Sequence, residues 1–270
     1  MLELQNITKI YHPGSATEHR LFEGFSLTVP DGQFVSIVGS NGSGKTSLLN
    51  IICGSIGVEG GDVLVDGESI RKKKEFQRYA SMGRVYQDPA LGTAPNLTML
   101  ENLSLADNKG KTFGLSRGVN RKRLDFYRSE LSALGLGLED KLDVKMGALS
   151  GGQRQAVALL MATLTPLRFL ILDEHTAALD PKTAEIIMEL TGKVIREKGL
   201  TALMVTHNLR YAVEYGDRLL MLNQGHVVMD RAGEEKARTS IDEVMETFNR
   251  IALETGVGQT GLQKFPDPYQ

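Results

Sequence analysis

Residues 34–46 read Phe-Val-Ser-Ile-Val-Gly-Ser-Asn-Gly-Ser-Gly-Lys-Thr, and this stretch decides the fold. The part up to Val38 is almost continuously apolar, which predicts a central strand buried on both faces of a sheet. The part from Gly39 matches G-x-x-x-x-G-K-[ST], in which glycines let a loop wrap closely around phosphate groups. A helical pattern follows at Ser47–Cys53, so the positive end of a helix dipole would face the same anion. The stretch therefore predicts a strand, a phosphate-binding loop and a helix.

The loop residues have distinct expected roles in holding a nucleotide. Lys45 would neutralise the β- and γ-phosphates, and the hydroxyl of Thr46 would bind Mg²⁺. The predicted nucleotide-binding residues of this stretch are Gly39, Ser40, Asn41, Gly42, Ser43, Gly44, Lys45, Thr46 and Ser47. The triplet Gly110-Lys111-Thr112 is not a second copy, because Leu105 stands where the first glycine belongs.

Strand patterns surround a helical middle region. Phe25, Leu27 and Val29 alternate with polar residues, as in a half-buried strand. From about Asn96 to Leu149 apolar residues recur at helical spacing, among them Leu97, Leu100, Leu103 and Leu105, then Leu124, Tyr127, Leu131 and Leu134. Strand patterns return at 169–172 and 202–205, and residues 219–229 favour a hairpin. The order indicates an α/β core interrupted by a helical insertion.

Two adjacent acids end the strand pattern at 169–172. Asp173 is suited to holding Mg²⁺, usually through water, and Glu174 to polarising the water that attacks the γ-phosphate. His207 follows the strand pattern at 202–206. A lone histidine there is more often structural, but strand ends of a parallel sheet gather at one edge, which makes His207 a candidate γ-phosphate contact. His175 lies beside the acids and receives no role.

Composition excludes several classes of protein. The 270 residues carry a net charge of -2, with 41% hydrophobic and 24% charged residues, which is ordinary for a globular protein and argues against a strongly basic nucleic-acid binder. The basic runs at 71–74 and 121–123 are predicted to be solvated surface. Cys53 is the single cysteine, which suits a reducing compartment. The N-terminus lacks the apolar region of a signal peptide, and the most apolar stretch, 156–172, is too short to span a membrane.

A second motif points to a family. Leu149-Ser150-Gly151-Gly152-Gln153 resembles the signature motif of ATP-binding cassette (ABC) ATPases. Other motifs of that family follow in its usual order, and together they cover about residues 2–235. Tyr11 resembles the aromatic residue that stacks on adenine. Gln87 resembles the Q-loop glutamine that touches Mg²⁺ and the coupling surface. Residues 178–180 resemble the D-loop with Asp180, and His207 resembles the switch histidine.

The resemblance implies a fold and an assembly. The fold is a P-loop NTPase core with an N-terminal antiparallel β subdomain and an inserted helical subdomain. A single ABC ATPase domain would cover 1–240, with its nucleotide-binding core at about 1–90 and 160–235, the insertion at about 91–159, and a helical tail at 241–270. ATP would lie between the loop of one chain and residues 150–153 of a second copy, in a head-to-tail dimer. Ser150 can cap the helix that starts there, and Gly151 and Gly152 allow close approach to an anion.

The resemblance also implies a function: a Mg²⁺-dependent ATPase subunit of a transporter, cytoplasmic and peripheral on the inner face of the membrane. Its direct partners would be a second copy of itself and membrane permease subunits, which would dock around Gln87 and residues 88–102. A substrate-binding protein would be an indirect partner, and no nucleic-acid partner is expected. Most members have proline where His175 stands, and 155–161 replaces a stretch that often carries arginines. With these two departures the sequence resembles a bacterial subgroup of binding-protein-dependent importers. Aromatic or other hydrophobic amino acids are among the suggested cargoes of that subgroup.

Three alternatives receive less support. A soluble ABC-type ATPase usually carries a long coiled-coil insertion or two cassettes, and this sequence has neither. A P-loop GTPase would carry an N-K-x-D motif for guanine, which is missing. Exporters often fuse membrane helices to the cassette, so a free-standing cassette favours import.

Overall fold

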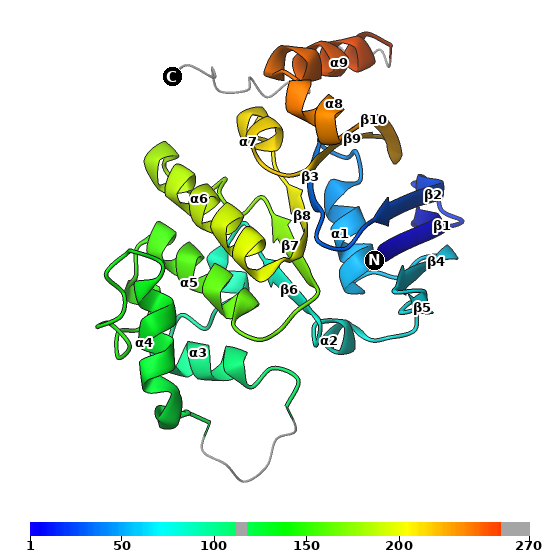
Figure 1. Cartoon of the computed structure of the whole chain (residues 1–270). Coiled ribbons are helices and arrows are strands. Elements are labelled where there is room, and N and C mark those ends of the chain that lie inside the picture. Colours follow the sequence, from blue (N-terminus) through cyan, green and yellow to red (C-terminus); the bar gives the residue numbers. More distant parts are fainter. Residues whose placement is uncertain (112–117, 255–270) are drawn as a thin grey trace. The chain divides into compact units, whose positions relative to one another are not determined.

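The computed structural model describes residues 1–111 and 118–254 and is shown in Figure 1. The chain forms two compact units. The first combines Met1–Glu75 with the chain from Leu203 onward, and the second is Phe76–Ala202. In the described part of the chain, no helix combines the length and the apolar character that a membrane crossing requires.

An antiparallel sheet opens the first unit. Its strands are β1 (Leu2–Tyr11), β2 (His19–Val29), β4 (Gly60–Val65) and β5 (Glu68–Ser69), in the order β2-β1-β4-β5 (Figure 1). The alternation predicted at the end of β2 is confirmed, since Phe25, Leu27 and Val29 are buried while Ser26 and Thr28 are exposed. One face of this strand therefore belongs to the core.

The other strands of this unit surround β3 (Phe34–Gly39), whose six residues are all buried, as predicted for a central strand. Their order is β10-β9-β3-β8, with β8 (Thr201–Val205) crossing the boundary between the units. β9 (Arg218–Asn223) pairs parallel to β3 and antiparallel to β10 (His226–Ala232), which confirms the predicted hairpin. Its turn residues Gln224 and Gly225 both have positive φ, the backbone that a two-residue hairpin requires.

Among the described residues of the first unit, the helices beside these sheets are α1 (Lys45–Cys53), α7 (Leu209–Glu214), α8 (Gly233–Arg238) and α9 (Ile241–Glu254). The amphipathic helix expected in the tail is α9. Its buried Val244, together with Phe248 and Ile251, packs in one apolar cluster with Leu209 and Ala212 of α7 (Figure 1). Apolar burial thus fixes the described part of the tail to the unit.

The second unit is mainly helical. It holds the parallel pair β6 (Met82–Val85) and β7 (Phe169–Asp173), together with the end of α2 (Glu75–Arg78). Its longer helices are α3 (Met99–Asp107), α4 (Leu124–Ser132), α5 (Gly151–Thr163) and α6 (Pro181–Lys198). Single 3₁₀ turns lie at η1 (Pro89–Leu91), η2 (Arg121–Arg123) and η3 (Met146–Ala148).

The helical core confirms the predicted pattern only in part, because Leu97 lies before the start of α3 and Leu134 after the end of α4. Leu100, Leu103, Tyr127 and Leu131 are buried in one cluster. Leu105, which the sequence places on the same face, is 52% exposed, so that prediction is wrong. The reason is geometric, because a residue two positions after Leu103 lies on nearly the opposite side of a helix.

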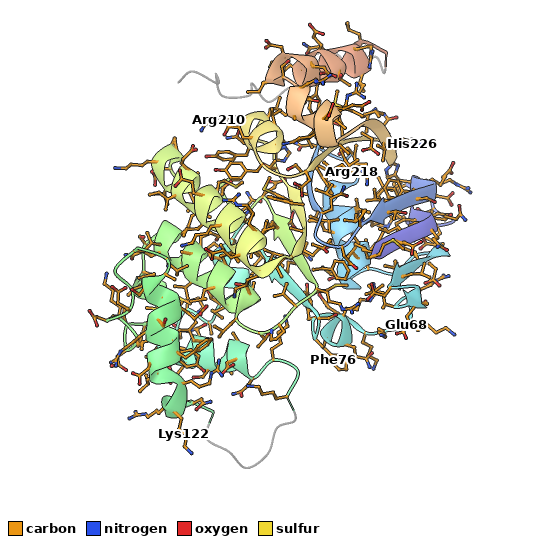
Figure 2. The ribbon with its side chains drawn as sticks, in the orientation of Figure 1. Glu68, Phe76, Lys122, Arg210, Arg218 and His226 are labelled. Atoms are coloured by element: carbon orange, nitrogen blue, oxygen red, sulfur yellow. The ribbon has the colours of Figure 1, made fainter. Side chains whose placement is uncertain are left out.

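The basic runs are less uniform than the sequence indicates. Lys122 is exposed before α4 (Figure 2), and residues 71–74 are exposed. However, the Arg71 guanidinium donates to the carbonyl oxygens of Val58, Glu59 and Gly61. Arg123 forms an ion pair of 2.9 Å with the buried Asp107. One arginine of each run therefore stabilises the fold rather than only facing water.

Candidate active site

The loop after β3 forms a narrow backbone cradle. Gly39 lies opposite Leu222 in the β3–β9 pair, and a Cβ on Gly39 would overlap the Leu222 carbonyl oxygen and lie 2.7 Å from Ser43 Oγ. Gly42 and Gly44 have φ values of 77° and 105°, which side chains strongly disfavour. The loop can take this path only with glycines at these positions, and its close backbone suits a phosphate group.

Lys45 sits at the end of the cradle, in the first turn of α1. Its side chain is 5% exposed, and Nζ donates to the carbonyl oxygens of Gly39 at 2.7 Å and Ser40 at 3.0 Å. The N-cap of α1 is Gly44, so no side chain covers the helix N-terminus. Thr46 is exposed in the same turn. These groups fit the phosphates of a nucleotide and an accompanying Mg²⁺, because an ammonium, a helix N-terminus and a hydroxyl converge there.

Tyr11 ends β1 beside this helix. Its hydroxyl lies 2.9 Å from Ser47 Oγ, and its ring is half-buried. The structure thus brings two sequence-predicted nucleotide-binding residues together, from positions 36 apart in the chain.

His207 lies just beyond β8, in the same unit as the cradle. Thr206 N donates to the carbonyl oxygen of Ile37 on β3, so the ends of these neighbouring strands are joined. Asn208 then caps α7 through its side chain. His207 is half-buried between these two features, at the end of the sheet where β3 leads into the cradle.

In the second unit, Asp173 ends β7 and is held by an arginine that the sequence analysis missed. Arg84 on β6 donates to Asp173 Oδ2 at 2.7 Å, and the two side chains are 7% and 14% exposed. A charged residue inside the apolar strand Met82–Val85 was the available signal. Glu174 follows with a φ of 49°, a left-handed conformation that is strained for this residue and common at functional sites.

His175 anchors the chain directly after Glu174. Its side chain is 2% exposed, and Nε2 lies 3.0 Å from Thr191 Oγ1 on α6. Burial lowers the pKa of His175 to about 4, so the ring is neutral near pH 7 and does not supply positive charge to a phosphate. Its contact is with the protein: it ties the segment after β7 to α6.

Gln87 is exposed two residues after the end of β6. The preceding Tyr86 carbonyl accepts a hydrogen bond of 3.1 Å from the buried Gln155 of α5, which fixes the backbone beside Gln87. The next residue, Asp88, caps η1 by accepting from Ala90 N at 2.9 Å. The segment that the sequence associates with docking therefore starts from a well-anchored position.

Ser150 caps α5 as predicted. Its Oγ accepts from Gln153 N, and Gln153 Oε1 accepts from Ser150 N, both at 3.2 Å, which forms a capping box. Gly151 is exposed, whereas a Cβ on Gly152 would overlap the Thr183 side chain of α6. Gly152 is thus needed for packing α5 against α6, a reason that the sequence alone did not reveal.

Asp180 caps α6 and is exposed. Its Oδ1 accepts from Thr183 N at 3.1 Å, and hydrogen bonding to Thr183 lowers the pKa of this carboxyl. The predicted site residues thus fall into two groups, one in each unit. Tyr11, the cradle and His207 belong to the first; Gln87, residues 150–153, Asp173, Glu174 and Asp180 belong to the second.

The comparisons with known proteins decide the family. Residues 22–177 match the sequence profile of the ABC transporter family. The chain belongs to the ABC transporter family. A tyrosine transport ATP-binding protein of Clostridioides difficile is 46% identical to this cassette over 248 residues, 92% of this chain and 98% of the relative. A thiamine import ATP-binding protein of Vibrio parahaemolyticus is 36% identical, over 93% and 100% of the two chains.

Solved ABC cassettes share the fold. One is a dimeric ATP-binding cassette in a post-hydrolysis state with ADP and phosphate: it has a TM-score of 0.73 and 32% identity, over 86% of this chain and 98% of the other. Another, an ABC transporter cassette in its ADP conformation, has a TM-score of 0.74 and 26% identity, over 96% and 99%. The predicted ABC ATPase fold is confirmed, and the chain is the ATP-hydrolysing subunit of an ABC transporter rather than a soluble ATPase with another task.

Proposed function

We propose that this ABC ATPase drives import of an aromatic amino acid, tyrosine above all, by hydrolysing ATP with Mg²⁺ in a head-to-tail dimer. The observation that carries the cargo is the relative named for tyrosine transport, which matches nearly the whole of both chains at 46% identity. The thiamine-import relative, at similar coverage, is 36% identical. The buried His175, where most family members have proline, supports membership of the same amino-acid-importing subgroup.

The cradle supplies the binding half of the site. Backbone N–H groups of 39–46 and the N-terminus of α1 face the phosphates, and Lys45 exchanges its two carbonyl contacts for phosphate oxygens. Tyr11 stacks on the adenine ring. Thr46 and Gln87 would hold Mg²⁺ directly and Asp173 through water; when bound, the ion neutralises charge that develops on the phosphate oxygens.

Two residues, Glu174 and His207, act at the γ-phosphate. Glu174 accepts a hydrogen bond from the attacking water and orients it towards the γ-phosphate. His207 contacts the γ-phosphate from the end of β8. The strained φ of Glu174, together with the His175–Thr191 contact beside it, supports a carboxylate kept in one position before the substrate binds.

The second copy completes the site. The capped N-terminus of α5 at Ser150 presents positive dipole character to the γ-phosphate bound by the other chain. Asp180 lies at the N-terminus of α6 and would face the same partner. The dimeric ATP-binding cassette with ADP and phosphate supports this arrangement.

Permease subunits bind this chain on the cytoplasmic side of the membrane, and a substrate-binding protein delivers the cargo to them. Gln87 and the residues 88–102 form the proposed docking segment. Leu91 is a large exposed apolar side chain within it, which suits contact with a membrane protein.

Reconstitution tests this proposal. The full chain is combined in liposomes with its co-purifying permease subunits and binding protein, and phosphate release is measured with tyrosine, phenylalanine or thiamine enclosed with the binding protein. Tyrosine should stimulate hydrolysis severalfold, and thiamine should not. Lys45→Ala controls for contaminating ATPases, because it should abolish nucleotide binding. Stimulation by thiamine but not by either amino acid would refute the cargo.

A further inference from the structure

Arg84 and Asp173 form a nearly buried ion pair on neighbouring strands. In the parallel register of β6 and β7, Arg84 lies opposite Ile171. Asp173 follows Ile171 by two residues, so it is on the same face of the sheet and within diagonal reach of Arg84. The contact of 2.7 Å from Arg84 Nη2 to Asp173 Oδ2 is therefore a consequence of the strand register.

A second contact limits the movement of Arg84. Its guanidinium carbon lies 4.7 Å from the centroid of the ring of Tyr86, the first residue after β6. The Tyr86 hydroxyl in turn lies 3.3 Å from the Tyr79 hydroxyl, and the Tyr86 carbonyl oxygen accepts a hydrogen bond from Gln155. The guanidinium is thus held between a carboxylate and an anchored aromatic ring.

This pairing changes the charge that Asp173 offers to a cation. A carboxylate that is 14% exposed is costly to leave unpaired, and Arg84 provides its countercharge without any nucleotide. A divalent cation beside Asp173 would then face an Arg84–Asp173 pair whose net charge is near zero. The Arg84 guanidinium would also repel the cation, because the low dielectric of the site screens this repulsion only weakly.

We propose that Arg84 is a positioning residue that acts through Asp173: it neutralises the carboxylate in the nucleotide-free protein and opposes Mg²⁺ binding unless the phosphates of ATP arrive with the metal. The inference rests on the proposed role of Asp173 in holding Mg²⁺. The negative charge of the phosphates restores the attraction that Arg84 removes, so metal and nucleotide enter together. Arg84 also orients the carboxylate by occupying Oδ2.

The experiment measures Mg²⁺ dependence separately from nucleotide affinity. A non-hydrolysable ATP analogue is titrated into the full chain at a series of Mg²⁺ concentrations and in EDTA, which gives the half-saturating Mg²⁺ concentration and the metal-free affinity. In Arg84→Met the half-saturating Mg²⁺ concentration should fall roughly tenfold, as expected when one nearby screened positive charge is removed. The affinity in EDTA should change less than twofold.

Further variants separate charge from folding. Arg84→Gln removes the charge but keeps a donor for Asp173, so it should shift the Mg²⁺ dependence in the same direction even where Arg84→Met does not fold. Arg84→Lys keeps the charge and should stay within twofold of the parent. Arg128→Met removes an exposed arginine paired at 3.8 Å with Asp125, and should change neither quantity.

Two results overturn the inference in distinguishable ways. A half-saturating Mg²⁺ concentration that is unchanged or raised in both Arg84→Met and Arg84→Gln shows that Arg84 does not oppose the metal. Asp173→Asn tests the proposed role of Asp173 in holding Mg²⁺. Because this variant loses the carboxylate, it should bind Mg²⁺ more weakly and raise the half-saturating Mg²⁺ concentration. If Asp173→Asn has no effect, the proposed metal role of Asp173 fails, and the inference fails with it. If Asp173→Asn changes the half-saturating Mg²⁺ concentration and the Arg84 variants do not, the inference about Arg84 fails and the proposed function stands.

Discussion

Gly39 is the cradle position where a single methyl group should be most destructive. In Gly39→Ala the new Cβ overlaps the carbonyl oxygen of Leu222, a backbone atom that cannot rotate away, so β3 and β9 must separate locally. Overpacking of this kind costs about 1–3 kcal/mol, and a strained backbone about 1–3 kcal/mol, so we expect about 4 kcal/mol in total. Gly42→Ala is the matched control in the same loop. Its φ of 77° is strained, but its Cβ meets nothing within 4 Å, so it should cost about 1–2 kcal/mol.

The assay is thermal unfolding followed by circular dichroism, without nucleotide or Mg²⁺, so that ligand binding does not enter. For a chain of this size the two costs correspond to midpoints lowered by about 12 °C for Gly39→Ala and about 4 °C for Gly42→Ala. Equal midpoints for the two variants would refute the reasoning, because they would show that Leu222 does not fill the space beside Gly39. The β3–β9 register would then be wrong.

Four other changes test the site. Glu174→Gln should lower turnover at least 100-fold in a phosphate-release assay while ATP binding persists, and unchanged turnover would exclude its role as base. Tyr11→Ala should raise the KM for ATP severalfold, whereas Tyr11→Phe should stay within twofold because it keeps the ring and loses only the contact with the Ser47 hydroxyl. Ser150→Ala breaks the capping box and should lower stability by about 1 kcal/mol in urea unfolding, with Ser150→Thr near the parent. His175→Ala should cost about 2 kcal/mol in the same assay through a lost hydrogen bond and a new cavity, and an unchanged midpoint would show that the Thr191 contact contributes nothing.

Local chemistry made part of this protein predictable. The strand, cradle and helix at 34–53 follow from an apolar run, glycines at fixed spacing and a helical pattern, all within one short segment. The cap at Ser150 is local for the same reason, because its partner Gln153 is three residues away. The resemblance of residues 149–153 to the ABC signature also needed nothing beyond adjacent residues, and the family comparison confirms the assignment.

The sequence by itself therefore determined the fold class, the family and the positions of the candidate site residues, because each of these depends on neighbours along the chain. Only the tertiary structure decided what distant residues do to one another. Arg84 reaches Asp173 across 89 positions because two parallel strands share a register, and the neutral, buried state of His175 depends on α6 packing over it. Gly152 is needed because Thr183 lies against it. Pairing, burial and packing are properties of the folded chain. Residue types alone identify the candidate charged groups of the site, but the fold decides which of them carry a charge.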